Sequence, residues 1–211
     1  RRPIRVTGVS TQVRALLLAA LLTVVPVTIG VVVADDGTPP KREPVAYRGA
    51  DLASYDTTKV AVQRAPFCDL LPSEAVAAAV GGDADLTAYG NGEESNVVPG
   101  SDVAHEYGCR YDGTGDADGV VAAAWVFAPL VTADRAAQLA RATREKGCTT
   151  PPDAAAYGDP TLAQVCVGDD RRTVSHRGLF GDAWLTCSLA APIAVPEADL
   201  VQRAGRWCVA V

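Results

Sequence analysis

Hydrophobic and polar residues alternate along residues 103–111, so that the side chains of this segment fall on two distinct faces. One face carries Glu106, Gly108 and Arg110. A period of two residues is typical of a half-buried strand, and the segment is therefore predicted to be one. The larger residues on its other face are Val103, His105, Tyr107, Cys109 and Tyr111.

Other strands are predicted from shorter apolar runs. Residues 120–127 are apolar on both faces, which is the pattern of a central strand. Gly181 and Asp182 are expected to form the turn between the last two strands. The remaining strand patterns are at 59–63 (as an edge strand), 162–167, 172–177 and 183–189.

Three helices are predicted from capping residues and apolar stripes. The first begins after Pro72 and continues through Val80, where two glycines stop it. The second begins at the capping residue Thr132 and ends at Gly147. The third begins at Pro196 and has acidic residues in its first turn, where the helix dipole favours them.

The order of these elements is helix, strands, helix, strands, helix. Short connections between successive strands predict antiparallel pairing. We therefore expect an α+β fold over residues 65–211, an antiparallel sheet with three packing helices, preceded by one N-terminal transmembrane helix. The repeated helix-then-strands order also suggests a degenerate duplication.

The N-terminal part of the chain has the pattern of a membrane anchor. Residues 15–34 are an uncharged apolar run of 20 residues, which as a helix spans about 30 Å, the thickness of the hydrocarbon core. Arginines within residues 1–14 precede it and two aspartates follow it, so the positive-inside rule places residues 1–14 in the cytoplasm. A signal anchor in the plasma membrane is the preferred interpretation, and a cleaved signal peptide, which would release a secreted domain, is the alternative. Residues 35–64 are then an extracytoplasmic linker rich in proline and charge.

The distribution of charge narrows the range of partners. The chain of 211 residues has a formal net charge of −6, but residues 1–34 carry four arginines and no acid. The rest of the chain therefore holds 15 basic and 25 acidic residues, a net charge of −10. Nucleic acid and anionic lipid surfaces both require a basic face, so this balance argues against either as a partner of the exported part.

Six cysteines lie beyond the apolar segment. An even number of cysteines in an exported chain indicates up to three disulfides, and the absence of any C-x-x-C spacing leaves no basis for a zinc ribbon or a thioredoxin-like site. The first expected bridge, Cys148–Cys166, closes a short loop from the second helix to the next strand. The second, Cys109–Cys187, joins the inward faces of two strands, and the third, Cys68–Cys208, ties the first helix to the last.

Catalytic and metal-binding motifs are weak in this sequence. His105-Glu106 resembles the start of H-E-x-x-H, but the segment is predicted to be a strand, and the residue at the second ligand position is Cys109. The acidic loop at 112–119 lacks the glutamate that closes a calcium loop. Neither a nucleophile elbow nor a phosphate-binding glycine loop is present. No catalytic residue, metal ligand or cofactor is therefore predicted.

Aromatic residues supply the candidate contact surface. Trp125, Trp184 and Trp207 could each stack on a sugar, although such side chains more often fill the core beside disulfides. Trp184 is expected to be the one partly exposed, because it shares a strand face with polar residues. Leu179 and Phe180, at the expected hairpin tip, are predicted to reach a ligand or partner together with it.

The segment at residues 65–81, APFCDLLPSEAVAAAVG, resembles the "C-x-L-L-x-x-x-E-x-x-x-x-x-G" opening of a family of actinobacterial secreted lipoproteins and membrane-anchored envelope proteins of unknown function. The segment YGCRY at 107–111 is similar to the central strand of that family, and residues 182–187 and 207–208 are similar to its later positions. The family's usual lipobox cysteine is missing, which favours a protein anchor. The resemblance implies an envelope domain and carries over no catalytic residue.

The sequence thus favours a membrane-anchored extracytoplasmic domain that binds an envelope protein, a cell-wall component or a small ligand. An extracytoplasmic sensor or carrier domain is the alternative, which an internal cavity lined by the tryptophans would support. A cell-envelope hydrolase would instead require a cleft that gathers His105, His176 and a carboxylate.

Overall fold

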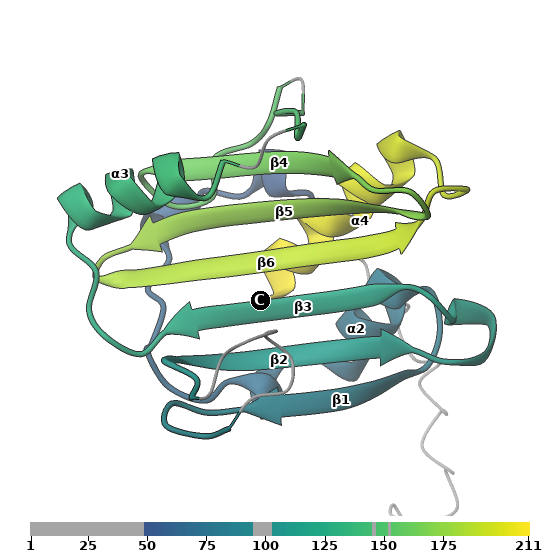
Figure 1. The fold of residues 1–211 in the computed structure, drawn as a ribbon, viewed down its shortest axis with the longest axis horizontal. Coiled ribbons are helices and arrows are strands. Elements are labelled where there is room, and N and C mark those ends of the chain that lie inside the picture. The colour runs from purple at the N-terminus through teal and green to yellow at the C-terminus, as the bar shows by residue number, and fades with distance from the viewer. Residues whose placement is uncertain (1–48, 95–102, 145–146, 152) are drawn as a thin grey trace, which may run out of the picture. The chain divides into compact units, whose positions relative to one another are not determined.

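Six antiparallel strands form one sheet in the order β1-β2-β3-β6-β5-β4 (Figure 1). The computed structural model describes residues 49–94, 103–144, 147–151 and 153–211. The α+β fold with an antiparallel sheet and three helices is thereby confirmed. The elements are α2 (Ser73–Val80), β1 (Ala84–Tyr89), β2 (Glu106–Gly113), β3 (Val121–Phe127), α3 (Ala133–Ala142), β4 (Thr161–Val167), β5 (Arg171–Phe180), β6 (Ala183–Pro192) and α4 (Glu197–Ala210).

The predicted anchor at 15–34 and the segment 1–14 lie outside the described residues. Within the described ranges, no helix is both long enough and apolar enough to cross a bilayer.

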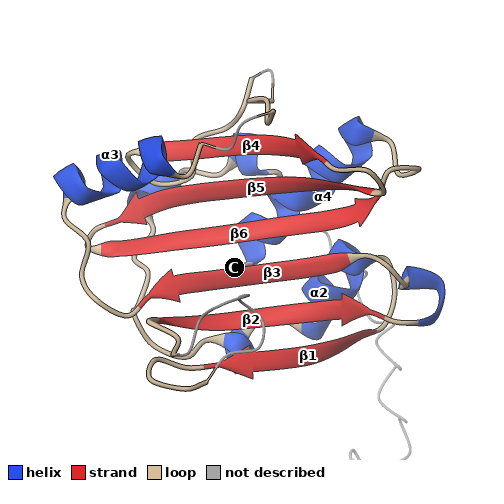
Figure 2. Ribbon diagram, in the orientation of Figure 1, coloured by secondary structure: helices blue, strands red, loops and turns tan. Residues whose placement is uncertain are grey.

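The two faces of the sheet have different environments. One face, which carries Cys109, Ala124 and Cys187 in a single row across β2, β3 and β6, packs against α2 and α4 and is called the helical face here. Figure 2 shows these two helices together on the far side of the sheet. Trp207 of α4 meets the ring of Tyr111 edge-on at a centroid distance of 5.8 Å. The burial of these side chains is the main contribution to the core.

The opposite face, which carries Gly108, Ala123 and Ser188 in its strands, is called the open face. Helix α3 covers only one end of it, over β5 and β6 (Figure 2). The Thr132 side chain accepts a hydrogen bond from the backbone N–H of Arg135, which caps this helix as predicted. The helix ends at Ala142, five residues before the predicted Gly147. Among the described residues, a pocket lies on this face where α3 does not reach.

Three parts of the sequence interpretation need correction. Strand β1 was not predicted, although Ala84, Leu86 and Ala88 alternate with polar residues; four of its six residues are exposed. The predicted edge strand at 59–63 is not a strand: a 3-10 helix occupies Thr57–Lys59, and Val60 and Val62 pack against the core. The segment interpreted as a linker is, from residue 49 onward, part of the folded body, since Leu52 is buried beside α4.

The disulfides pair residues in a different way from that expected. Cys148–Cys166 is confirmed, but the other two bridges are Cys68–Cys109 and Cys187–Cys208, so the predicted pairs Cys109–Cys187 and Cys68–Cys208 are wrong. The physical reason is the strand order. Cys109 and Cys187 both lie opposite Ala124, on either side of β3. Two strand spacings separate them by about 9–10 Å, beyond the Cα distance that a disulfide spans. Three disulfides indicate an oxidising, extracytoplasmic environment.

Candidate functional site

A pocket of about 450 Å³ lies on the open face of the sheet. Its floor is made of small side chains at the centre of the sheet, Ala123 of β3 and Ser188 and Ala190 of β6. Larger side chains surround this floor, and we call the whole the open-face pocket. Its surrounding residues are Tyr89, Glu106, Arg110, Trp125, Arg171 and Thr173.

The strand register explains why the pocket forms here. Arg110, Ala123 and Ser188 are direct neighbours across β2, β3 and β6, so two short side chains lie next to a long one. In the adjacent row Gly108 lies between Tyr89 and Trp125, and the ring of Tyr89 covers it. Side chains on one face of a sheet stand side by side, and short neighbours therefore leave a depression between tall ones.

Tyr89 reaches across Gly108, which has no side chain to obstruct it. A methyl group at Gly108 would overlap the ring of Tyr89, so only glycine allows this position of the ring. The Tyr89 hydroxyl donates a hydrogen bond of 2.8 Å to Oε1 of Glu106. Burial, followed by the charge of Glu106, raises the pKa of Tyr89, and its hydroxyl stays protonated as a donor. Burial likewise raises the pKa of Glu106, while the hydrogen bond from Tyr89 opposes that rise.

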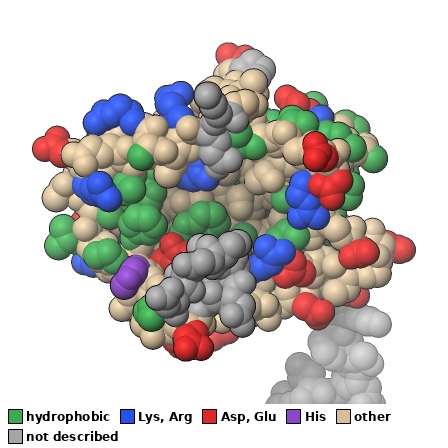
Figure 3. All heavy atoms as spheres, viewed as in Figure 1, with side chains coloured by type: hydrophobic (Ala, Val, Ile, Leu, Met, Phe, Trp, Pro, Cys, Tyr) green, Lys and Arg blue, Asp and Glu red, His purple; other side chains and the backbone are tan. Residues whose placement is uncertain are grey.

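Two arginines contribute positive charge to the pocket wall, and each has a carboxylate neighbour. Arg110 donates from Nε and Nη2 to the two carboxylate oxygens of Asp112, a bidentate pair. Nε of Arg171 lies 3.9 Å from Oδ1 of Asp170. On the visible part of this face hydrophobic, basic and acidic side chains are mixed, and no single charge dominates (Figure 3).

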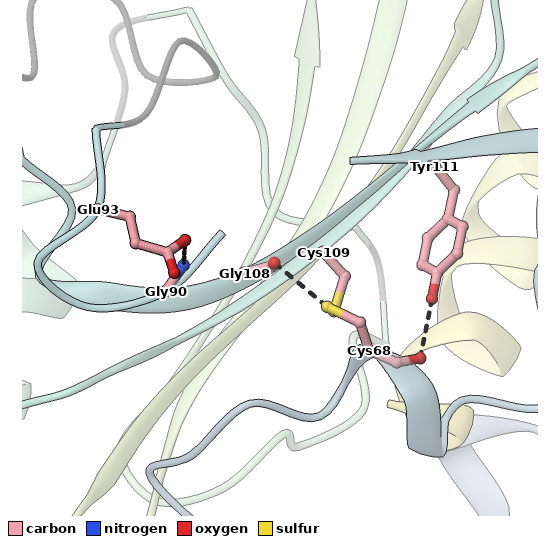
Figure 4. The surroundings of a disulfide bond; sticks show 6 residues. All are labelled: Cys68, Gly90, Glu93, Gly108, Cys109 and Tyr111. Atoms are coloured by element: carbon pink, nitrogen blue, oxygen red, sulfur yellow. Dashed lines mark hydrogen bonds between the residues drawn. A yellow bond between two sulfur atoms is a disulfide. The ribbon is translucent and has the colours of Figure 1, made fainter. Parts of the chain in front are cut away.

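Behind the pocket, a disulfide fixes β2 to the segment before α2. Cys68 belongs to a 3-10 helix and bonds Cys109, the neighbour of Gly108 in β2 (Figure 4). The Tyr111 hydroxyl donates to the Cys68 carbonyl at 3.2 Å. Both contacts hold β2 in place from the helical face, which leaves its other face available to carry the wall of the pocket.

The predicted contact surface at Trp184, Leu179 and Phe180 is wrong, because all three side chains are buried. Leu179 and Trp184 face each other across β5 and β6, and Val131 and Ala136 pack against them. Phe180 points to the helical face and meets Tyr157 edge-on. The turn contains only Gly181 and Asp182, so the two hydrophobic residues belong to the strand and not to an exposed tip.

The histidines do not meet in a cleft. His176 is buried on the helical side of β5, whereas His105 is exposed just before β2. Neither histidine lines the open-face pocket. In the part of the chain that the structure describes, no group of three or more His, Cys, Asp or Glu side chains is placed to hold a metal ion.

Most residues around the pocket were missed from the sequence, although part of the signal was present. The alternation at 103–111 places Glu106, Gly108 and Arg110 together on one face, and the register confirms that they share it. Trp125 was named as a candidate for stacking on sugars, and it is the tryptophan that lines the pocket. Tyr89 gave no signal, because β1 itself was not predicted.

Replacing Gly108 with alanine is expected to lower the free energy of unfolding by about 1–3 kcal/mol, because the new methyl group displaces the Tyr89 ring and breaks its hydrogen bond to Glu106. Chemical denaturation of the two proteins measures this loss. In a Tyr89→Ala background the methyl group has room, and most of the cost should vanish. Gly168→Ala, where the added methyl group meets only ordinary contacts, serves as the control. An equal cost of Gly108→Ala in both backgrounds would contradict this role of the glycine.

Comparison with known proteins gives no family for this chain. No model of a protein family matches the sequence, and no curated protein sequence matches it. What the chain does is therefore inferred from its own geometry.

Proposed function

We propose that this protein is a membrane-anchored extracytoplasmic envelope domain that binds a ligand in the open-face pocket. The disulfides support the extracytoplasmic location, and the arginine-flanked apolar run at 15–34 supports the anchor. The resemblance of residues 65–81 to envelope proteins agrees with the same location.

The observation that carries the binding role is the composition of the open-face pocket. Its volume, about 450 Å³, lies within the range of ligand-binding pockets, about 300–1,000 Å³. An aromatic ring, hydroxyl groups, a carboxyl group and guanidinium groups converge on a floor of small residues. Polar groups placed around a floor of small side chains orient a bound molecule.

The residues around the open-face pocket favour a binding domain over a hydrolase and over a carrier protein that encloses its ligand. A hydrolase would need a nucleophile with a base, or two carboxyl groups placed for acid and base roles, whereas Glu106 is the one carboxylate among the described residues of the pocket. A carrier would enclose its ligand among the tryptophans, but Trp184 and Trp207 lie in the packed core. Trp125 alone among them contributes to the pocket.

The role of the pocket can be tested with the full chain purified in detergent and immobilised. Cell-envelope extract is passed over the wild-type protein and over Trp125→Ala, and small molecules and glycans in the eluate are identified by mass spectrometry. We expect compounds that the wild-type protein retains and Trp125→Ala does not. Ile193→Ala, which removes an exposed hydrophobic side chain that does not line the pocket, is the matched control and should retain them. Identical eluates from all three proteins would refute the binding role of the pocket.

A further inference from the structure

Carboxylates lie close to both arginines of the open-face pocket, which bears on the class of its ligand. Arg110 is engaged by both oxygens of Asp112, and Asp170 lies beside Arg171. Glu106 adds a further carboxyl group. Among the described residues around the pocket, each arginine has a carboxylate close by, which offsets part of the attraction of its guanidinium for an anionic ligand.

The polar groups also disfavour a wholly apolar ligand. Glu106, Arg110, Thr173 and Ser188 all line the pocket and are only partly buried, so water reaches them. An apolar molecule would remove that water and return no hydrogen bond. Each polar group buried without a partner costs about 1–3 kcal/mol.

Trp125 provides the third constraint. It is one of three tryptophans in the chain, and the other two are each 1% exposed. Trp125 is only partly buried, and its cross-strand neighbour Gly108 is covered by the ring of Tyr89. A large aromatic ring at the edge of a wet pocket offers a flat apolar surface with polar groups around it.

We infer that the open-face pocket binds a neutral saccharide; this inference rests on the proposed function and names its ligand class. A pyranose ring has an apolar face of C–H groups that can stack on Trp125. Its hydroxyl groups both donate and accept, which matches a wall that holds a carboxyl acceptor, Glu106, and guanidinium and hydroxyl donors such as Arg110 and Ser188. Because the ligand is uncharged, the two arginine–carboxylate pairs remain intact when it binds.

The test measures binding of the full chain in detergent to immobilised neutral oligosaccharides that cover the common hexoses and pentoses in both anomeric forms. Uronic-acid and sulfated oligosaccharides of similar size form a second set. We expect at least one neutral oligosaccharide to bind, and its affinity to change less than about twofold when salt rises from about 0.05 to about 0.5 M, because no ion pair forms with the ligand. Free monosaccharide added as a competitor distinguishes recognition of one sugar unit from recognition of a longer chain.

Three variants connect the binding to the pocket. Trp125→Ala is expected to weaken binding about tenfold or more, which corresponds to about 1.4 kcal/mol, whereas Trp125→Phe keeps a stacking face and recovers part of the affinity. Asp112→Asn leaves Arg110 without its charged partner, and we expect this variant to bind the uronic-acid and sulfated oligosaccharides as well. Ile193→Ala is the unaffected control.

Failure of this inference can be distinguished from failure of the proposed function. Binding of the acidic set alone, or neutral binding that Trp125→Ala leaves unchanged, would overturn the saccharide assignment. The assignment also fails if the envelope extract yields only ligands that are not carbohydrates; if these depend on Trp125, the proposed binding function still holds. If neither experiment finds a ligand that depends on Trp125, both proposals are wrong.

Discussion

Replacing Cys68 and Cys109 with alanine is expected to lower the free energy of unfolding by about 4 kcal/mol. The bridge closes a sequence separation of 41 residues, and the chain-entropy relation assigns a loop of this length about that value. Cys109 is in addition 1% exposed, so its replacement also removes packed atoms from the core. Denaturant unfolding under non-reducing conditions, compared with the wild-type protein, measures the loss.

Single replacements distinguish the observed pairing from the one expected from sequence. In Cys68→Ser, alkylation followed by peptide mapping should find a free thiol at Cys109, because that is its partner in the structure. A free thiol at Cys208 would instead support the sequence-based pairing. Cys187→Ser is the matched control and should free Cys208.

His176 is expected to make the protein sensitive to acid. Its side chain is 3% exposed, and neither ring nitrogen has a hydrogen-bond partner among the described residues. Burial lowers the pKa of His176 from 6.5 to about 4, because the charged imidazolium would lose its water. Between these two values the unfolded chain binds a proton that the folded chain does not. The stability contribution is therefore fully present above pH 6.5 and is lost as the pH falls toward 4.

The size of this effect follows from the shift. The free energy of unfolding should fall by about 3 kcal/mol between about pH 7 and pH 4 on account of this one group. His176→Leu cannot take up the proton, so the difference in stability between it and the wild-type protein should change by that amount over the range. His105→Gln, at the exposed second histidine of the chain, should keep the wild-type profile. Parallel pH profiles for His176→Leu and the wild-type protein would contradict the assignment.

Several elements were predictable because their signals are local. The cap at Thr132 and the turn at Gly181 depend only on neighbouring residues, and the structure has both. The alternation over 106–111 reflects one buried and one wetter face of β2. The prediction was wrong for Val103 and His105, which precede the strand and are exposed. The presence of disulfides also followed from the even number of cysteines beyond the apolar segment, since three bridges use all six.

Other features could not be predicted from the sequence, because they depend on which strands are neighbours in the sheet. Strand β1 is held at the edge of the sheet by pairing with β2, and four of its six residues are exposed. Trp184 shares its strand face with polar residues, and the sequence could not show that α3 would cover its end of the sheet. The same limit applies to Cys109 and Cys187, whose inward directions were predicted and whose separation by β3 was not.

The sequence by itself determined the class of fold, the exported character of the domain and the presence of disulfides, because composition and short-range periodicity encode these. The tertiary structure decided the pairing of the cysteines and the position of the open-face pocket. That pocket exists because strand order brings small residues of β3 and β6 beside large ones from β1, β2 and β5. Register across distant strands is set by the packing of the whole core, and a single strand does not carry it.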